Sequence, residues 1–129
     1  MGQPKSVLIV GLQPELIDFS SPDFAAFPGL TAAKVRASLE ADAVRLQGLG
    51  YDAQLCLTDF GETAEAVLLD CLRRQPYDCV LIGAGVRTVP KNLLLFEKLI
   101  NVIHANAPQA KICFNTKPDD TADAVRRWI

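Results

Sequence analysis

The sequence predicts an α/β protein in which a parallel sheet lies between two layers of helices. Apolar strand-like runs alternate with helical segments along the whole chain, and this alternation is typical of parallel sheets. Two of the runs are apolar enough to be buried on both faces, whereas a third alternates apolar and polar residues as an edge strand does. The 129 residues, half of them hydrophobic, suit a single domain over residues 1–129.

The first half of the chain contains two predicted strands and one helix between them. Residues 6–10 form a continuous apolar run that ends at Gly11, which predicts a buried strand. Thr31 can cap a helix that ends near Gly48. Residues 51–58 alternate between apolar and polar side chains, so we expect a strand at one edge of the sheet.

The second half repeats the alternation. It predicts a helix over 62–75, a buried strand over 77–82, a long helix from Pro90 to about Ala107, a strand over 110–115 and a last helix that begins at Asp119 and Asp120. Right-handed crossovers, together with the edge character of the second strand, favour the strand order 2-1-3-4. This architecture is a three-layer αβα, flavodoxin-like (Rossmann-like) fold with four strands.

Composition excludes several classes of partner and location. With 13 basic and 15 acidic residues and no basic stripe, the chain is not expected to bind nucleic acid. No apolar run approaches the about 20 residues of a membrane span, and the first residues lack a signal-peptide pattern. The four cysteines lie in apolar stretches without a C-x-x-C pair, which predicts buried, reduced thiols and a cytoplasmic location.

A ligand of an open parallel sheet is expected outside the carboxyl ends of the strands. The third strand ends in Gly83-Ala84-Gly85, whose glycines could adopt positive φ angles and leave amides free, and Arg87 could grip a carboxylate or phosphate. We therefore predict a pocket for a compact anion; the alternative is a tight turn with a solvated arginine. The predicted binding residues are Gly11, Gly83, Gly85, Arg87, Thr116 and Lys117.

The connection over residues 13–30 is longer than the about two to six residues usual in this fold, and it holds three of the six phenylalanines. It is either a mobile aromatic lid over the site or a fixed cover of the sheet, and both alternatives stay open. If the protein is an enzyme, Asp18 and Asp59 are the candidate general bases.

Common cofactor and metal signatures are absent from the sequence. Gly11 is not followed by G-x-G-x-x-G, and neither a phosphate-binding P-loop nor a G-x-S-x-G nucleophile turn occurs. One histidine and scattered cysteines provide no familiar spacing for a transition metal. We expect no cofactor and no metal site.

Three stretches resemble the receiver domain of response regulators. Val7–Val10 resembles its first strand, Gly61–Ala66 the entry to its second helix, and Tyr77–Ile82 its central strand. The resemblance covers four of the usual five strands, and it implies the same flavodoxin-like fold.

The functional residues of receivers do not carry over. Gly11 and Leu12 stand where the resemblance places an acidic pair, and Gly83 stands where it places the phosphoacceptor aspartate. Thr116 matches the hydroxyl residue of the family, whereas Lys117 does not correspond to its lysine. The chain therefore resembles a degenerate receiver, for which neither a Mg²⁺ site nor phosphorylation is expected.

Three functions remain open at this point. The domain could bind a compact anionic ligand at the strand ends, act as a cofactor-free enzyme on a small anionic substrate under the aromatic loop, or serve as a pseudo-receiver that binds other proteins. The first two require Arg87 and Lys117 to converge on one anion.

The predicted fourth strand is an apolar edge, and apolar edges invite pairing. The long third helix also carries the run 93–96 (Leu-Leu-Leu-Phe), which is wider than one core-facing stripe. These features predict a homodimer through the fourth strand and that helix; the alternative is that the last helix covers the edge.

Overall fold

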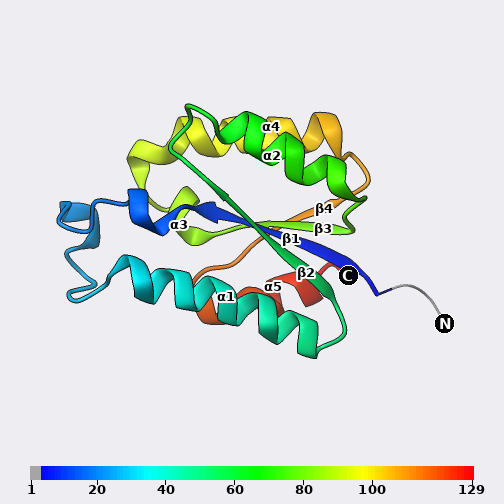
Figure 1. The fold of residues 1–129 in the computed structure, drawn as a ribbon, viewed down its shortest axis with the longest axis horizontal. Helices are drawn as coiled ribbons and strands as arrows, with labels where there is room; N and C mark the ends of the chain where they lie inside the picture. The colour runs from blue at the N-terminus through cyan, green and yellow to red at the C-terminus, as the bar shows by residue number, and fades with distance from the viewer. Residues whose placement is uncertain (1–3) are drawn as a thin grey trace.

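A computed structural model describes residues 4–129 as a four-stranded parallel sheet between two helical layers (Figure 1). The elements in chain order, with η marking a 3-10 turn, are β1 (Ser6–Leu12), η1 (Pro14–Leu16), η2 (Pro22–Phe24), α1 (Ala32–Gly48), β2 (Asp52–Thr58), α2 (Ala64–Arg74), β3 (Cys79–Ile82), α3 (Ala84–Arg87), η3 (Pro90–Asn92), α4 (Leu93–Asn106), β4 (Lys111–Phe114), η4 (Pro118–Asp120) and α5 (Thr121–Arg126). The strand order is β2-β1-β3-β4, which confirms the predicted flavodoxin-like fold class.

The central strands explain why their sequences are continuously apolar. All seven residues of β1 are buried, because helices cover both faces of the sheet. Leu8 and Val10 pack under α2 and α4, whereas Val7 and Ile9 point to α1 and α5. Successive side chains of a strand alternate between faces, so the same run of residues supplies both halves of the core.

The boundaries of α1 confirm the predicted caps. Thr31 Oγ1 accepts a hydrogen bond from the backbone N–H of Lys34 at 3.2 Å, which satisfies one of the free donors of the first turn. Just beyond the helix, Gly50 adopts a φ of 98°, a conformation that only glycine takes without strain.

Gly11 and the turn after β3 differ from the prediction. β1 continues to Leu12, so Gly11 lies inside the strand, where an added Cβ would sit 3.6 Å from a Leu39 methyl. The predicted positive φ angles after β3 are wrong: Gly83 has a φ of −69°, and Gly85 lies in the short helix α3. The chain enters a right-handed turn directly, closed by the Val86 N–H to Gly83 carbonyl bond, so the turn needs no glycine-only conformation.

The long connection after β1 lies beyond the carboxyl ends of the strands, where two described ion pairs hold it (Figure 1). Arg36 of α1 pairs with Glu15, and Lys91 of η3 lies 3.3 Å from the Asp23 carboxylate. Phe19 and Phe24 pack against each other within the loop, with their rings tilted by 50° and their centroids 5.3 Å apart. The loop therefore joins the start of α1 to the segment before α4.

The four cysteines are buried, as predicted. Burial raises the pKa of the Cys56 thiol, and a hydrogen bond to Cys71 adds to this rise. Cys79 and Cys113 lie diagonally on β3 and β4 with their Sγ atoms 3.3 Å apart. No helix within residues 4–129 is both long and apolar enough to cross a bilayer.

Candidate functional site

A chain of polar side chains lies beneath the carboxyl ends of β3 and β4, and Asn115 is at its centre. Asn115 is buried, with 6% of its surface exposed. Its Oδ1 accepts the Ala84 N–H at 2.9 Å and an Arg87 Nη2–H at 3.5 Å, and its Nδ2 donates to Thr121 Oγ1 at 3.0 Å. Thr121 in turn donates to Asp42 Oδ2 at 2.9 Å. We call Asp42, Thr121, Asn115 and Arg87 the Asn115 network.

The Asn115 network joins four parts of the fold. Asp42 comes from α1, Thr121 from the start of α5, Asn115 from the end of β4, and Arg87 from α3. Because one amide bonds both to the turn after β3 and to α5, it fixes that turn against the lower helical layer. Every hydrogen-bonding atom of the Asn115 side chain is thereby used inside the protein.

Asp42 is the unusual ionisable group of this network. Burial raises the pKa of its carboxyl to about 6, even though the Thr121 hydrogen bond and the positive charge of Arg45 act in the opposite direction. The carboxylates of Asp119 and Asp120 raise this pKa further. Asp42 therefore titrates in the weakly acidic range, where an ordinary aspartate is already ionised.

Arg87 is held in place on several sides. Its Nε donates to the Ile82 carbonyl at 3.2 Å, and its guanidinium carbon lies 5.1 Å from the centroid of the Phe114 ring. Burial lowers the pKa of Arg87, and the nearby Asp120 carboxylate opposes this effect. Among the described hydrogen bonds none uses Nη1, so part of the guanidinium remains available to another acceptor.

Lys117 and Thr116 are placed differently from Arg87. The Lys117 side chain is 66% exposed, and its Nζ lies 3.8 Å from an Asp119 carboxylate oxygen. Thr116 donates both its N–H and its hydroxyl to Asp120. Burial alone would raise the pKa of Asp120, but hydrogen bonds from Thr116 and Lys117 hold it below the ordinary value.

Both predicted cations interact electrostatically with a carboxylate of the protein itself, Asp120. Asp120 acts electrostatically on Arg87, and Lys117 acts on Asp120. No described contact joins Arg87 to Lys117 directly. The Asp120 carboxylate thus partly takes the role that we expected for a bound anion.

The two candidate bases act as caps of local turns. Asp59 accepts hydrogen bonds from the Gly61 N–H and from the N–H and hydroxyl of Thr63, and these bonds lower its pKa. Asp18 accepts two bonds from Ser20, which lower its pKa as well. A general base is most effective when its pKa is near the working pH, so neither carboxylate is suited to that role at neutral pH.

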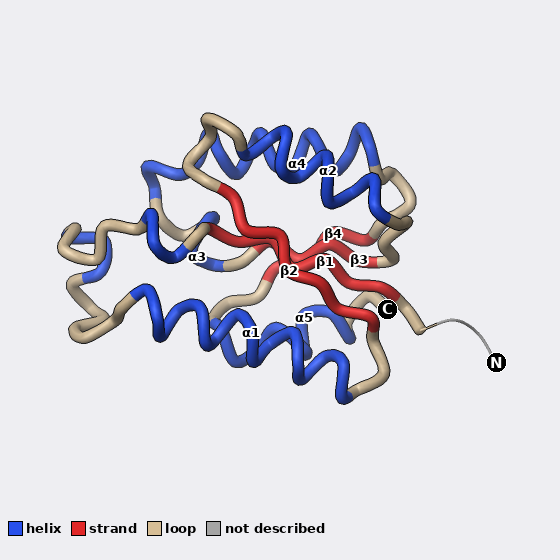
Figure 2. The backbone as a smooth tube through the Cα atoms, viewed as in Figure 1, coloured by secondary structure: helices blue, strands red, loops and turns tan. Residues whose placement is uncertain are grey.

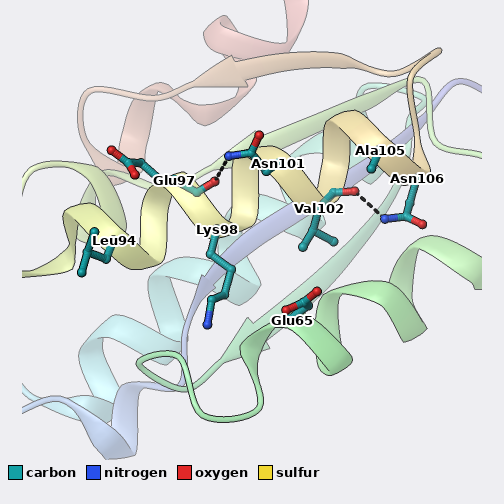
Figure 3. Close-up of a pocket in the computed structure, with 8 residues that line it drawn as sticks. All are labelled: Glu65, Leu94, Glu97, Lys98, Asn101, Val102, Ala105 and Asn106. Atoms are coloured by element: carbon teal, nitrogen blue, oxygen red, sulfur yellow. Dashed lines mark hydrogen bonds between the residues drawn. The ribbon is translucent and has the colours of Figure 1, made fainter.

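Two open hollows mark the surface, and both lie away from the strand ends. One, of about 420 Å³, lies between α2 and α4, where Lys98 reaches toward the turn before α2 with its Nζ 3.4 Å from the Gly61 carbonyl oxygen (Figure 3). The other, of about 480 Å³, lies between α1 and β2 and is bordered by Val44 and Leu55. None of the predicted site residues lines either hollow.

Asp42, Asn115 and Thr121 are the members of the network that are absent from the predicted binding residues. One signal existed for Asp42: it follows Leu39 by three positions and precedes Leu46 by four, so it borders the apolar stripe of α1. Thr121 offered no such signal, because a threonine in the first turn of a helix is ordinary.

The arrangement holds the turn after β3 against α1 and α5, and Asp42, with a pKa of about 6, is the carboxyl of the network. The ionisable groups at the strand ends are neutralised or hydrogen-bonded within the protein, and within residues 4–129 no three His, Cys, Asp or Glu side chains gather as metal ligands. No protein-family model matches the chain, and no curated protein matches it in sequence, so its fold and its own residues carry the argument for function.

Proposed function

We propose that this chain is a cytoplasmic, non-catalytic binding module that meets its partners through its outer surface. The Asn115 network carries the proposal, because the polar side chains at the strand ends bond mainly to one another. The weak basicity of Asp18 and Asp59 agrees with it. Four buried free thiols favour the cytoplasm, where thiols stay reduced.

A second candidate is the binding of a compact anion at Arg87. Two features favour it: no described hydrogen bond uses Nη1 of Arg87, and Lys117 is exposed. Each cation could donate to a phosphate or carboxylate while it also interacts with Asp120. This candidate would keep the binding set Gly83, Gly85, Arg87, Thr116 and Lys117, with Gly11 left inside β1.

A thermal-shift panel separates the two candidates. The protein is heated with inorganic phosphate, nucleotides and small carboxylates, and the midpoint of unfolding is compared with that of the free protein. For a binding module we expect no rise at millimolar ligand, whereas a ligand that binds the native state must raise the midpoint. A rise that Arg87→Ala abolishes would establish the anion site and overturn our first proposal.

The matched control for this panel is Arg73→Ala. Arg73 is an exposed arginine in the last turn of α2, far from the strand ends. A rise that disappears equally in both variants would reflect general charge rather than a site at Arg87.

A further inference from the structure

Strand β2 has an open outer edge. The Asp52 N–H and the Thr58 carbonyl bond to the β1 side of the sheet, and the direction of these groups alternates along a strand. The N–H and carbonyl groups of Ala53, Leu55 and Leu57 therefore point away from the sheet. Gln47 Nε2 covers the Ala53 carbonyl at 3.1 Å, and among residues 4–129 the other five groups accept or donate no described hydrogen bond.

The opposite edge, β4, is better protected. It has four residues, begins with the exposed Lys111, and its Phe114 carbonyl accepts a hydrogen bond from Arg127 Nη2 at 3.0 Å. Short length and an edge lysine are common protections against unwanted pairing. β2 has seven residues and contains neither lysine nor proline. Of the two edges, β2 is therefore the one prepared to receive a strand.

The surface beside β2 continues this edge on the α1 side. The hollow between α1 and β2 is bordered by Ala43, Val44, Ala53 and Leu55. Val44 is 64% exposed although it is apolar. Figure 2 shows β2 crossing in front of the other strands, with α1 below it and α2 and α4 above. A protein that added a strand to β2 could therefore also pack against Val44 of α1.

We propose that β2 pairs with β2 of a second copy of this chain, antiparallel about a twofold axis at Leu55. In this register the two Leu55 residues exchange two hydrogen bonds, and Ala53 lies opposite Leu57 of the partner subunit. The pairing joins two four-stranded sheets into one continuous sheet of eight strands. The proposal rests on the binding-module function and names its partner.

The occupant is a second copy because the edge is complementary to itself. The register about Leu55 pairs the three outward N–H groups of each copy with the three outward carbonyls of the other. The Leu57 N–H then donates to the carbonyl of the partner subunit's Ala53, which must share or give up its bond from Gln47. The one charged side chain of β2, Asp52, then lies opposite Thr58 of the partner subunit, so no like charges face each other. Val44 borders the same hollow as Leu55, so an axis at Leu55 would bring it toward Val44 of the partner subunit and cover an exposed apolar side chain.

The dimer proposed from the sequence used β4 and α4 instead. We favour a dimer through β2 over one through β4, because β4 is short and its Phe114 carbonyl already accepts a hydrogen bond from Arg127. The exposed Leu93 and Leu94 of α4 remain a competing surface, and the experiment below includes it.

Sedimentation velocity from micromolar to near-millimolar concentration tests the proposal. We expect a dimer of the 14.0 kDa chain. Val44→Glu places two carboxylates together at the axis, where like charges repel, and should weaken dimerisation by about tenfold or more. Leu94→Glu makes the same chemical change on α4, at a side chain 75% exposed, and should leave the dimer intact.

Hydrogen–deuterium exchange identifies the strand itself. The amides of Ala53, Leu55 and Leu57 should become protected as concentration rises, and Val44→Glu should remove this protection. Because Val44 is exposed, its substitution leaves the core unchanged, and circular dichroism checks the fold.

Three results would overturn the proposal: a monomer at every concentration, a dimer broken by Leu94→Glu but not by Val44→Glu, or a dimer without protection of the β2 amides. A monomer would overturn the dimer alone, and the thermal-shift panel would still test the binding-module function. A ligand hit at Arg87 overturns that function whether or not a dimer forms, so the two failures are distinguishable.

Discussion

Replacing Asn115 with alanine is expected to lower the free energy of unfolding by about 2–4 kcal/mol, because it leaves buried partners without their hydrogen bonds. The Ala84 N–H loses its only described acceptor, Arg87 loses one, and Thr121 Oγ1 loses a donor. The loss also frees the turn after β3 from α5, so the change acts on two layers of the fold.

Urea unfolding followed by circular dichroism measures this effect, and Asn101→Ala is the control. Asn101 lies on the exposed side of α4, where its Nδ2 donates to the Glu97 carbonyl one turn earlier. Alanine favours helix there, so this control should change stability by only a few tenths of a kcal/mol. Similar small effects of both substitutions would mean that the Asn115 network contributes little to the fold.

Asn115→Asp refines the same prediction. The carboxylate keeps the acceptor for the Ala84 N–H and gives Arg87 a charged partner, but it cannot donate to Thr121. We expect a smaller loss than for alanine at pH 7 if the bonds to the β3 turn dominate, and an equal loss if the bond to Thr121 does. The comparison therefore assigns the stability to one side of the network.

The layers and strand order could be predicted because they depend on local patterns. The seven buried residues of β1 place it inside the sheet, and the alternation of β2 correctly predicted its edge position. The alternation did not predict which β2 residues are buried, because Cys56 and Thr58 on its second face are covered as well. The Thr31 cap and the helix it begins are equally local. Patterns of this kind need no knowledge of distant residues.

The candidate site could be predicted only in its location. Asn115 bonds to Ala84 and Thr121, and Thr121 to Asp42, across separations of 31, 6 and 79 positions, respectively. A sequence pattern does not show such pairs. The wrong prediction of positive φ angles at Gly83 and Gly85 has a related cause. Glycine permits such angles, but an ordinary right-handed turn already satisfies the backbone after β3.

The edges illustrate the same limit. The apolar run of β4 suggested an open edge, and the protection by Arg127 depends on where the end of α5 lies. The alternation of β2 correctly predicted an edge strand. The hydrogen-bonding groups of that edge point sideways, so the alternation does not show whether another element covers them. Which edge is open is therefore decided by neighbouring elements rather than by the composition of the strand.

Replacing Asp42 with asparagine is expected to stabilise the protein at neutral pH but not under acidic conditions. Folding raises the pKa of Asp42 from 3.8 to about 6, so the folded state binds a proton more tightly than the unfolded state does. The contribution of this group to stability is therefore fully present below about pH 4 and is lost as pH rises through 6. Asparagine has the same shape, stays neutral and still accepts the Thr121 hydroxyl.

The size of this effect follows from the pKa and from partial exposure. The rise of the pKa from 3.8 to about 6 corresponds to about 3 kcal/mol at pH 7.5. Because Asp42 is only half-buried and solvent screens its charge, we expect about 1–2 kcal/mol. Urea unfolding of the parent and Asp42→Asn at pH 4 and pH 7.5 measures the difference between them. Comparing the two proteins at the same pH cancels titrating groups that do not interact with Asp42, including Asp18 and Asp59, whose pKa values shift in the opposite direction.

Asp123→Asn separates this effect from a general loss of negative charge. Asp123 is an exposed aspartate on α5, close in sequence to Thr121 but outside the network, and its substitution should change stability little at either pH. A gain in stability for Asp42→Asn that is equal at pH 4 and pH 7.5 would contradict the prediction, because it would show that the gain does not come from removing an ionised carboxyl. A gain confined to the higher pH would mean that the ionised, half-buried carboxyl of Asp42 lowers the stability of the protein. Asp42 would then be kept for its hydrogen bond to Thr121, which connects it through Asn115 to the turn after β3.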